Sequence, residues 1–240
     1  MKHLILFPVM VFSLLIAVKC TALASEVPSE VSSERSPGEK SWNFKVYLDQ
    51  KEIGYQSFKL LPKPDGSQVS IEAKFDVEFF FINVYSYRHN NSETWKNGCL
   101  QSIESKTDDN GDNFFVMGSR ADNGFAIKSH AGEQQLQGCV KTFSYWDASF
   151  LNSTRLLNSQ TGEYQSVQVR ELGNVEIDVL GKPTSATHYH ISTSDFQIDL
   201  WYSPDRSEWL ALQSTTAEGS VLRYKRALPE MLPMTVGEQS

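Results

Sequence analysis

Apolar and polar residues alternate with a period of two over much of the chain. In residues 71–79 (IEAKFDVEF), apolar side chains occupy every second position, and Glu, Lys or Asp occupies the positions between them. Residues 195–202 (DFQIDLWY) follow largely the same pattern. Because successive side chains of a strand point to opposite faces, this pattern predicts strands with one buried and one solvated face.

Shorter or less regular patterns predict further strands. They cover residues 42–48, 55–61, 85–95, 100–107, 113–119, 125–129, 164–171, 175–180, 187–192, 209–214 and 221–227. Turn sequences lie between them, including Asn-Gly pairs at 97–98, 110–111 and 123–124, and Asn-Gly supplies the positive φ angles of tight hairpins. We therefore predict an all-β fold: a single antiparallel meander forming a curved sheet or open β-barrel, with a closed barrel or a sandwich as alternatives.

One short helix is predicted near residues 145–151. Ser144 or Asp147 can cap its start, and Trp146, Phe150 and Leu151 can pack it onto the sheet. No internal repeat and no convincing linker interrupts the pattern, so one β-domain over residues 41–228 is expected.

The N-terminus resembles a cleavable secretory signal peptide over residues 1–24. Lys2 precedes an apolar run at 4–18, and Ala22-Leu23-Ala24 forms a small-residue cleavage site. A membrane anchor is disfavoured by the short run, and lipid attachment at Cys20 by the lysine before it. We expect an exported protein, periplasmic or otherwise secreted, with no transmembrane segment after cleavage.

The segments beside the β-domain are polar. Residues 25–40 (SEVPSEVSSERSPGEK) are rich in Ser, Glu and Pro, and residues 229–240 end in a small polar stretch. Such segments bury too little apolar surface to offset their ordering entropy, so a disordered leader and a flexible tail are predicted.

Charge and motifs exclude several function classes. The two lysines of the signal leave with it, which changes the net charge from −7 to −9, and no Lys/Arg cluster remains, so nucleic acid is not an expected partner. G-x-S-x-G, a phosphate-binding glycine loop, H-E-x-x-H and C-x-x-C are absent. No cofactor is predicted, and whether the protein is an enzyme stays open, with non-enzyme favoured.

Two cysteines, Cys99 and Cys139, remain after signal cleavage. In an oxidising compartment an even pair predicts one disulfide, although two separate buried thiols are the alternative. The sharpest metal candidate is His188-x-His190, with Asp199 as a third ligand, because residues i and i+2 of a strand share a face. We favour a polar strand face there and predict no metal site.

Ionisable and aromatic residues gather on the strand predicted at 85–95. Tyr85, Tyr87, His89, Glu93 and Trp95 share one face by the period of two, with Arg88 between them. Such a stripe is typical either of a pocket wall that contains a general base or of an amphipathic outer face. The sequence leaves both interpretations open.

Five stretches together resemble a known family. They are YLDQKEIG (47–54), YRHNNSETWKNG (87–98), SKTDDNG (105–111), SYWDASFLNSTRLL (144–157) with the adjoining NSQTG (158–162), and DLWYSP (199–204). In this order they are similar to the bacterial domain-of-unknown-function family 6134, over most of residues 42–228. The resemblance implies an exported, all-β protein of the bacterial envelope without an assigned function.

The resemblance also selects candidate residues, although it carries over no catalytic role. The positions that match its motifs are Arg88, His89, Glu93, Trp95, Asp108, Asp109, Tyr145, Trp146 and Trp201. With Tyr85 and Tyr87 added and Asp109 left out, they form our set of ligand-binding candidates. Open, curved barrels of this kind resemble the shells of periplasmic lipid carriers, which is an analogy at the level of fold.

Three functions are weighed in consequence. The first is a binding or carrier module for a lipid or other apolar envelope molecule, suggested by the aromatic residues at 79–87. The second is an assembly partner of another envelope protein through exposed strand edges. The third is an enzyme of unknown reaction that uses Arg88, His89 and Glu93 with Asp108 or Asp109, which requires these side chains to converge in one cleft.

Overall fold

The computed structural model describes residues 37–232 and consists almost entirely of β-strands. The strands are β1 (Lys40–Leu48), β2 (Lys51–Lys63), β3 (Gly66–Phe79), β4 (Ile82–Lys96), β5 (Cys99–Asp109), β6 (Asp112–Ala121), β7 (Gly124–Ser129), β8 (Gly132–Leu136), β9 (Arg155–Leu157), β10 (Tyr164–Ser166), β11 (Gln168–Val179), β12 (Lys182–Ser192), β13 (Gln197–Tyr202), β14 (Trp209–Thr215) and β15 (Val221–Ala227). Two 3-10 helices complete the described part: η1 (Ala148–Asn152) and η2 (Pro229–Met231). The predicted signal peptide, residues 25–36 of the leader and residues 233–240 of the tail lie outside the described residues.

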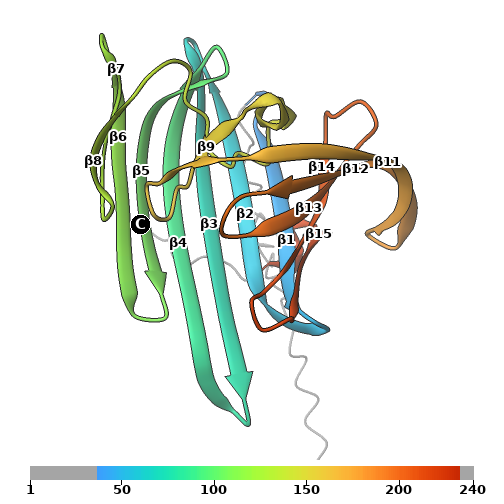
Figure 1. Ribbon diagram of the computed structural model, residues 1–240. Coiled ribbons are helices and arrows are strands. Elements are labelled where there is room, and N and C mark those ends of the chain that lie inside the picture. The colour runs from blue at the N-terminus through green and yellow to red at the C-terminus, as the bar shows by residue number, and fades with distance from the viewer. Residues whose placement is uncertain (1–36, 233–240) are drawn as a thin grey trace, which may run out of the picture. The chain divides into compact units, whose positions relative to one another are not determined.

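Thirteen strands form one curved, antiparallel sheet in the order β11-β12-β13-β14-β15-β1-β2-β3-β4-β5-β6-β7-β8 (Figure 1). β1 pairs with β15, so the first and last strands lie side by side within the sheet. Its edges are β8 and β11, which do not pair with each other in the described part of the chain, so the barrel is not closed. The predicted all-β meander is confirmed in its open, curved form.

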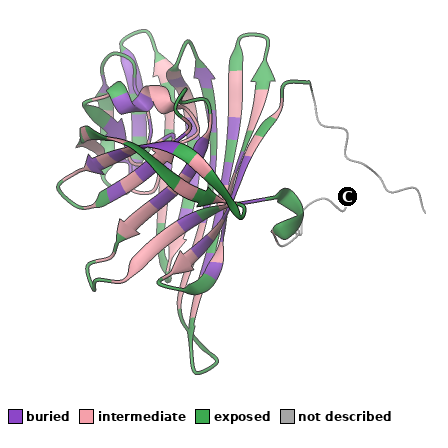
Figure 2. Cartoon of the chain, turned by 90° about the vertical axis from the view of Figure 1, so that its right-hand side faces the viewer, coloured by how far each residue is buried: buried purple, intermediate pink, exposed green. Residues whose placement is uncertain are grey.

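Local sequence explains most of these strands. In β3, Val69, Ile71, Ala73 and Phe75 are buried and alternate with more exposed residues, as the period of two predicts. The predicted turn pairs Asn97-Gly98 and Asn110-Gly111 have positive φ angles at both residues. Figure 2 shows the result as buried and exposed segments that alternate along the strands.

Four elements differ from the prediction. The strand expected at 175–180 is the second half of a single strand, β11, because Gly173 accommodates a bulge with φ 99° instead of a turn. β8 (GEQQL) and β9 (RLL) carry no alternating pattern and were not predicted. The predicted helix near residues 145–151 is the 3-10 helix η1, whose cap is Asp147: its carboxylate accepts a hydrogen bond from the Ser149 backbone N–H.

The segment between the two edge strands, residues 137–167, lies against the concave face of the sheet. The Trp146 ring packs 6.4 Å from Trp42 and 5.5 Å from Trp95, measured between centroids. The Tyr202 hydroxyl donates to the Tyr145 carbonyl oxygen over 2.5 Å, and the Tyr145 ring lies 5.2 Å from Trp209. Figure 1 shows β9 in front of the sheet. The core therefore lies between the sheet and this crossing segment, as in a two-layer domain.

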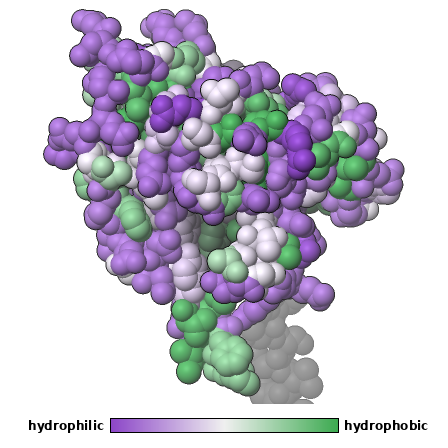
Figure 3. Space-filling model, viewed as in Figure 1, coloured by the Kyte–Doolittle hydropathy of each residue, from purple (hydrophilic) through white to green (hydrophobic). Residues whose placement is uncertain are grey.

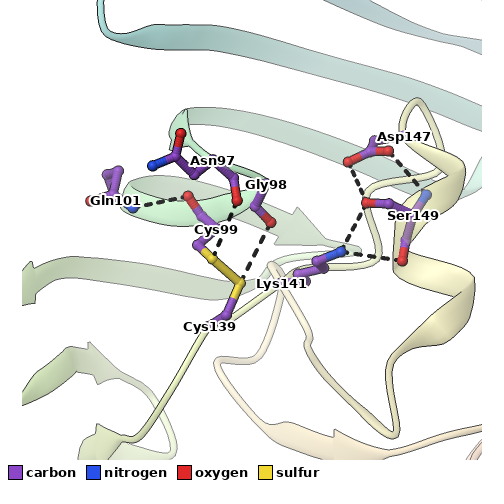
Figure 4. Close-up of a disulfide and its surroundings, with 8 residues drawn as sticks. All are labelled: Asn97, Gly98, Cys99, Gln101, Cys139, Lys141, Asp147 and Ser149. Atoms are coloured by element: carbon purple, nitrogen blue, oxygen red, sulfur yellow. Dashed lines mark hydrogen bonds between the residues drawn. A yellow bond between two sulfur atoms is a disulfide. The ribbon is translucent and has the colours of Figure 1, made fainter.

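A disulfide joins Cys99 at the start of β5 to Cys139 at the start of the crossing segment (Figure 4). The two Cα atoms are 5.1 Å apart, and beside them the Leu100 N–H donates to the Val140 carbonyl oxygen over 2.9 Å. Further along, the Lys141 ammonium donates to the Ser149 carbonyl and hydroxyl oxygens, which ties the segment to η1. The predicted disulfide is confirmed.

Candidate functional site

A partly open cavity of about 680 Å³ lies on the concave face of the sheet. Strands β1 to β5 and β15 form its floor, and the crossing segment contributes Phe143 and Tyr145 to its wall. Most lining side chains are apolar or aromatic: Leu48, Ile53, Phe58, Ile71, Ala73, Phe75, Val77, Phe143, Phe196 and Leu222, with Tyr85, Tyr87, Tyr145 and Tyr224. The concave face is thus a hollow, and ligand pockets of this size and lining are common in proteins.

One part of the cavity wall carries a hydrogen-bonded polar cluster. The Tyr85 hydroxyl donates to Asp109 Oδ1 over 2.7 Å, and Gln160 Nε2 donates to Asp109 Oδ2 over 3.0 Å. The Tyr87 hydroxyl donates to Gln160 Oε1 over 3.1 Å. Burial, followed by the hydrogen bond to Asp109, raises the pKa of Tyr85, and burial raises that of Tyr87, so both phenols are neutral at physiological pH.

The charge of this wall restricts what it can bind. Its ionisable carboxylates are Asp109 and Glu218, and no Lys or Arg is among the residues that line the cavity in the described chain. The phenol and carboxylate oxygens retain lone pairs that can accept hydrogen bonds. The arrangement therefore suits an apolar molecule whose polar end donates hydrogen bonds, such as a hydroxyl or an amine.

His89 lies on the same strand face as Tyr85 and Tyr87, as the sequence predicted. The residue is 5% exposed, its ring stacks on Tyr87 with centroids 6.2 Å apart, and its Nδ1 lies 2.8 Å from the Thr107 hydroxyl. Burial lowers the pKa of His89 from 6.5 to about 4, so the imidazole is neutral at physiological pH. It therefore adds a flat, uncharged side chain to the wall.

This neutral histidine makes the domain sensitive to acid. Because the folded pKa of about 4 is below the unfolded value of 6.5, the unfolded chain binds more protons between these values. We expect roughly 3 kcal/mol of unfolding free energy to be lost as the pH falls from 6.5 to 4. Urea unfolding at several pH values in this range measures how the unfolding free energy changes with pH. In His89→Gln this change should be smaller. An equally steep slope in the variant would assign the acid sensitivity to other groups.

The comparisons with known proteins agree with this architecture. Residues 44–227 match the family model described as Domain of unknown function (DUF6134). The chain belongs to this family. No curated protein matches the sequence. Among solved structures, the domain is similar to the crystal structure of a β-barrel-like protein of domain of unknown function DUF1849 from Brucella abortus. The identity is 11%, the TM-score is 0.58, and the match covers 78% of this chain and 94% of that chain. At this identity the likeness shows the fold alone.

The remaining candidates of the DUF6134 domain do not join this cavity. Arg88 belongs to the opposite face of β4, where its Nη2 pairs with both carboxylate oxygens of Asp76 at 2.7 and 2.9 Å. Asp108 accepts a hydrogen bond from the Gly111 N–H within a hairpin turn. Because Arg88 and His89 are adjacent in a strand, they point to opposite faces. The convergence of Arg88, His89 and Glu93 that an enzyme would need is not formed.

Asn91, Glu93 and Trp95 of the DUF6134 domain form a buried, hydrogen-bonded cluster in the core. The Glu93 carboxylate accepts from Asn91 Nδ2 and from Trp95 Nε1, both over 2.9 Å, and is fully buried. Burial raises the pKa of Glu93, and these hydrogen bonds partly offset the rise. The predicted shared face of Glu93 and Trp95 is formed, and both side chains are buried. The Trp95 ring packs 5.5 Å from the Trp146 ring of the crossing segment, measured between centroids.

His188, His190 and Asp199 meet on the other face of the sheet of the DUF6134 domain. His188 Nε2 and His190 Nδ1 lie 2.9 and 3.0 Å from the same oxygen, Asp199 Oδ1. The Trp201 ring stacks on His188 with centroids 4.6 Å apart. The predicted shared face is formed, yet within residues 37–232 no group of three or more His, Cys, Asp or Glu side chains could hold a metal ion.

The cavity also contains residues that were not among the ligand-binding candidates, namely Phe143, Gln160 and Tyr224. Gln160 is 73 residues from Tyr87 in the sequence, and only the crossing segment brings it to the sheet. The NSQTG stretch at 158–162 was the available signal, because the Asn158 side chain accepts a hydrogen bond from the backbone N–H of Gln160 in this turn.

No helix of the described residues is long and apolar enough to cross a bilayer.

Proposed function

We propose that this domain is a binding or carrier module for a small apolar molecule with an uncharged or cationic polar end, such as a lipid. The observation that carries the proposal is the cavity of about 680 Å³ on the concave face, which is lined mainly by apolar and aromatic side chains. A filled core would leave no such space, since protein interiors are close-packed. Drug-sized ligands occupy pockets of about 300–1,000 Å³.

The polar cluster gives this ligand a preferred orientation. Tyr85, Tyr87, Asp109 and Gln160 lie on one part of an otherwise apolar wall. Placing an anionic head group beside Asp109 without a basic partner would be unfavourable, because like charges repel strongly where water is excluded. A neutral alcohol, an amide or an amine satisfies the cluster, so neutral amphiphiles should bind more tightly than fatty acids.

The N-terminal sequence supports an envelope location for this activity. A signal peptide at residues 1–24 would export the chain, and the disulfide between Cys99 and Cys139 is of the kind that forms in oxidising compartments. We therefore propose that the carrier acts in the periplasm, where an apolar molecule needs a protein shell to cross water. Localisation of a tagged full-length chain by cell fractionation tests this part.

Filling the cavity should weaken ligand binding more than about tenfold. Ala73 of β3 is buried and lines the cavity, so a tryptophan at this position would occupy the ligand space. With N-phenyl-1-naphthylamine, a neutral apolar dye, we expect saturable binding by the natural protein and a loss of more than about tenfold in affinity for Ala73→Trp, since an excluded apolar contact of a few kcal/mol exceeds a factor of ten.

The matched control is Ala126→Trp, since Ala126 of β7 is exposed. This variant should bind the dye as the natural protein does. If Ala73→Trp does not fold, as a thermal melt would show, Ala73→Phe repeats the test with less volume. Unchanged dye affinity in a folded cavity variant, or no dye binding by the natural protein, contradicts the proposal. Native mass spectrometry of the purified protein should in addition show a co-purified apolar molecule.

The free edge of β11 supports assembly with another envelope protein as a second candidate. Leu172 and Val175 are exposed along this strand, which pairs only with β12 in the described chain. The bulge at Gly173 and the charges of Arg170 and Glu171 are, however, typical of edges protected from pairing. We rank this function second. Pull-down from envelope extracts with the natural protein and with Val175→Lys tests it. Recovery of the same partner in equal amounts by both proteins would contradict a contact through β11.

A further inference from the structure

The β3–β4 hairpin ends in an exposed apolar tip. Phe79, Phe80, Phe81 and Ile82, here called the aromatic tip, are 64%, 78%, 100% and 65% exposed. Figure 3 shows apolar residues gathered at the lower end of the molecule, where Figure 1 draws this hairpin. Large apolar side chains in a contiguous exposed group are unusual on a soluble domain and mark contact sites for proteins or membranes.

The backbone of the tip is strained by its sequence. Phe80 and Phe81 have φ angles of 47° and 65°, a left-handed conformation that bulky residues adopt at a cost. The hairpin turns at Asn97-Gly98 and Asn110-Gly111 use the residues that this conformation favours. Local folding therefore does not explain two phenylalanines at this turn, and strain of this kind is typical of functional sites.

The tip protrudes beyond the neighbouring strands. β3 pairs with β2 only as far as Phe75, and β4 pairs with β5 only from Tyr87, so residues 76–86 of this hairpin pair with each other and with no other strand of the described chain. At the base of this extension, the Lys51 ammonium donates to the Glu78 carbonyl oxygen over 2.7 Å. The base of the apolar tip thus contains the charged residues Lys51 and Glu78.

The cavity lies at the same end of the sheet as the tip. Val77 and Tyr85, which pair across the hairpin and line the cavity, are only two or three residues from the aromatic tip. Leu48, Asp109 and Leu222 also line it, and each lies at the strand end that faces this side. An apolar molecule that leaves the cavity along this hairpin would meet the tip.

We propose that the aromatic tip inserts into the interfacial region of a lipid bilayer. The size of the tip favours a membrane over a protein partner: four side chains are far fewer than the roughly 20–30 residues per side of a standard protein interface. A bilayer accepts a protruding point without a complementary surface, and apolar residues bury their side chains at its headgroup boundary. The proposal goes beyond the proposed function, because the tip can contact a membrane whether or not the cavity is occupied.

The charge distribution predicts which membranes bind. The tip residues are uncharged, and the chain has a net charge of −7, so insertion depends on apolar contact and not on attraction to anionic lipids. Sedimentation with phosphatidylcholine vesicles should therefore retain the natural protein at both low and high salt. Exchanging the turn in Phe80→Asn/Phe81→Gly should weaken the vesicle affinity roughly 100-fold, since burial of each phenylalanine contributes about tenfold or more.

The stability of this double variant shows whether a loss of vesicle binding comes from the tip or from misfolding. Asn-Gly suits the left-handed turn, so the variant should melt at a higher temperature than the natural protein although its affinity for vesicles is lower. The matched control is Leu180→Asn, because Leu180 is also exposed, has a φ of 54° and precedes a glycine in a hairpin turn. This control should sediment with vesicles as the natural protein does.

Three results would overturn the proposal. They are absence of vesicle binding by the natural protein, unchanged binding by Phe80→Asn/Phe81→Gly, and a tip-dependent dimer in sedimentation velocity that shows the tip to be a contact between copies of the chain. Binding of N-phenyl-1-naphthylamine in solution by the same double variant reports on the cavity alone. Failure of the tip and failure of the proposed carrier function are therefore separate outcomes.

Discussion

Replacing Gly54 with alanine is expected to destabilise the domain by more than about 4 kcal/mol, which places it among the most damaging single substitutions. Gly54 lies in β2 between Val46 of β1 and Phe75 of β3, with φ 151°. A Cβ atom added there would lie 1.9 Å from the Lys74 carbonyl oxygen and 2.9 Å from its carbonyl carbon. Both atoms belong to the backbone, so no change of rotamer can relieve the overlap, and the two strands would have to separate.

The matched control for this substitution is Gly219→Ala. Gly219 has φ 89° in the turn between β14 and β15, and an added Cβ meets no atom within 4 Å. Only the left-handed conformation is penalised there, at about 1–2 kcal/mol. Urea unfolding followed by circular dichroism measures both variants. Similar midpoints for the two would show that the sheet yields at Gly54 and that the close approach of β2 to β3 is not required.

Gly54 also shows how the fold and the cavity depend on each other. Its neighbour Ile53 and its cross-strand partner Phe75 both line the cavity. The hollow on the concave face thus needs β2 and β3 to approach closely at a position that only glycine can occupy. If part of the Gly54→Ala variant still folds, the folded protein should not bind N-phenyl-1-naphthylamine.

The sequence predicts the sheet well because its information there is local. The period of two places Tyr85, Tyr87 and His89 on one face of β4, and these three residues do line one cavity. Asn-Gly pairs likewise set the hairpins at 97–98 and 110–111. Each of these conclusions depends on residues that are neighbours in the chain.

The sequence does not predict the wall opposite the sheet, because that wall is made by distant contacts. Phe143, Tyr145 and Gln160 reach the cavity only because the segment after β8 crosses the concave face. Polar residues occupy both faces of the second half of β4, so the pattern does not show that His89 and Glu93 are buried. Motif membership likewise grouped Arg88 with residues that lie on the opposite side of the strand.

Removing the disulfide is expected to cost about 4 kcal/mol of unfolding free energy, by the loop-entropy estimate for a closed loop of about 40 residues. The sequence separation between Cys99 and Cys139 is 40, and the loop contains all of β5 to β8. Cys139 is exposed, so a reductant can reach the bond. Thermal melts of the natural protein with and without reductant, and of Cys99→Ser/Cys139→Ser without it, measure the loss.

The same bond should also control the cavity, since it anchors the crossing segment that carries Phe143, Tyr145 and Gln160. Even where the reduced domain stays folded, loss of the disulfide allows this segment to open locally, because local openings require less free energy than global unfolding. We therefore expect reduction to weaken N-phenyl-1-naphthylamine binding at temperatures below the melting transition, and the Cys99→Ser/Cys139→Ser variant to bind weakly with or without reductant. Full dye affinity in the folded, reduced protein would show that the contacts of Trp146 and Tyr145 hold the wall without the bond. Weakened binding would make the cavity dependent on the redox state of the compartment.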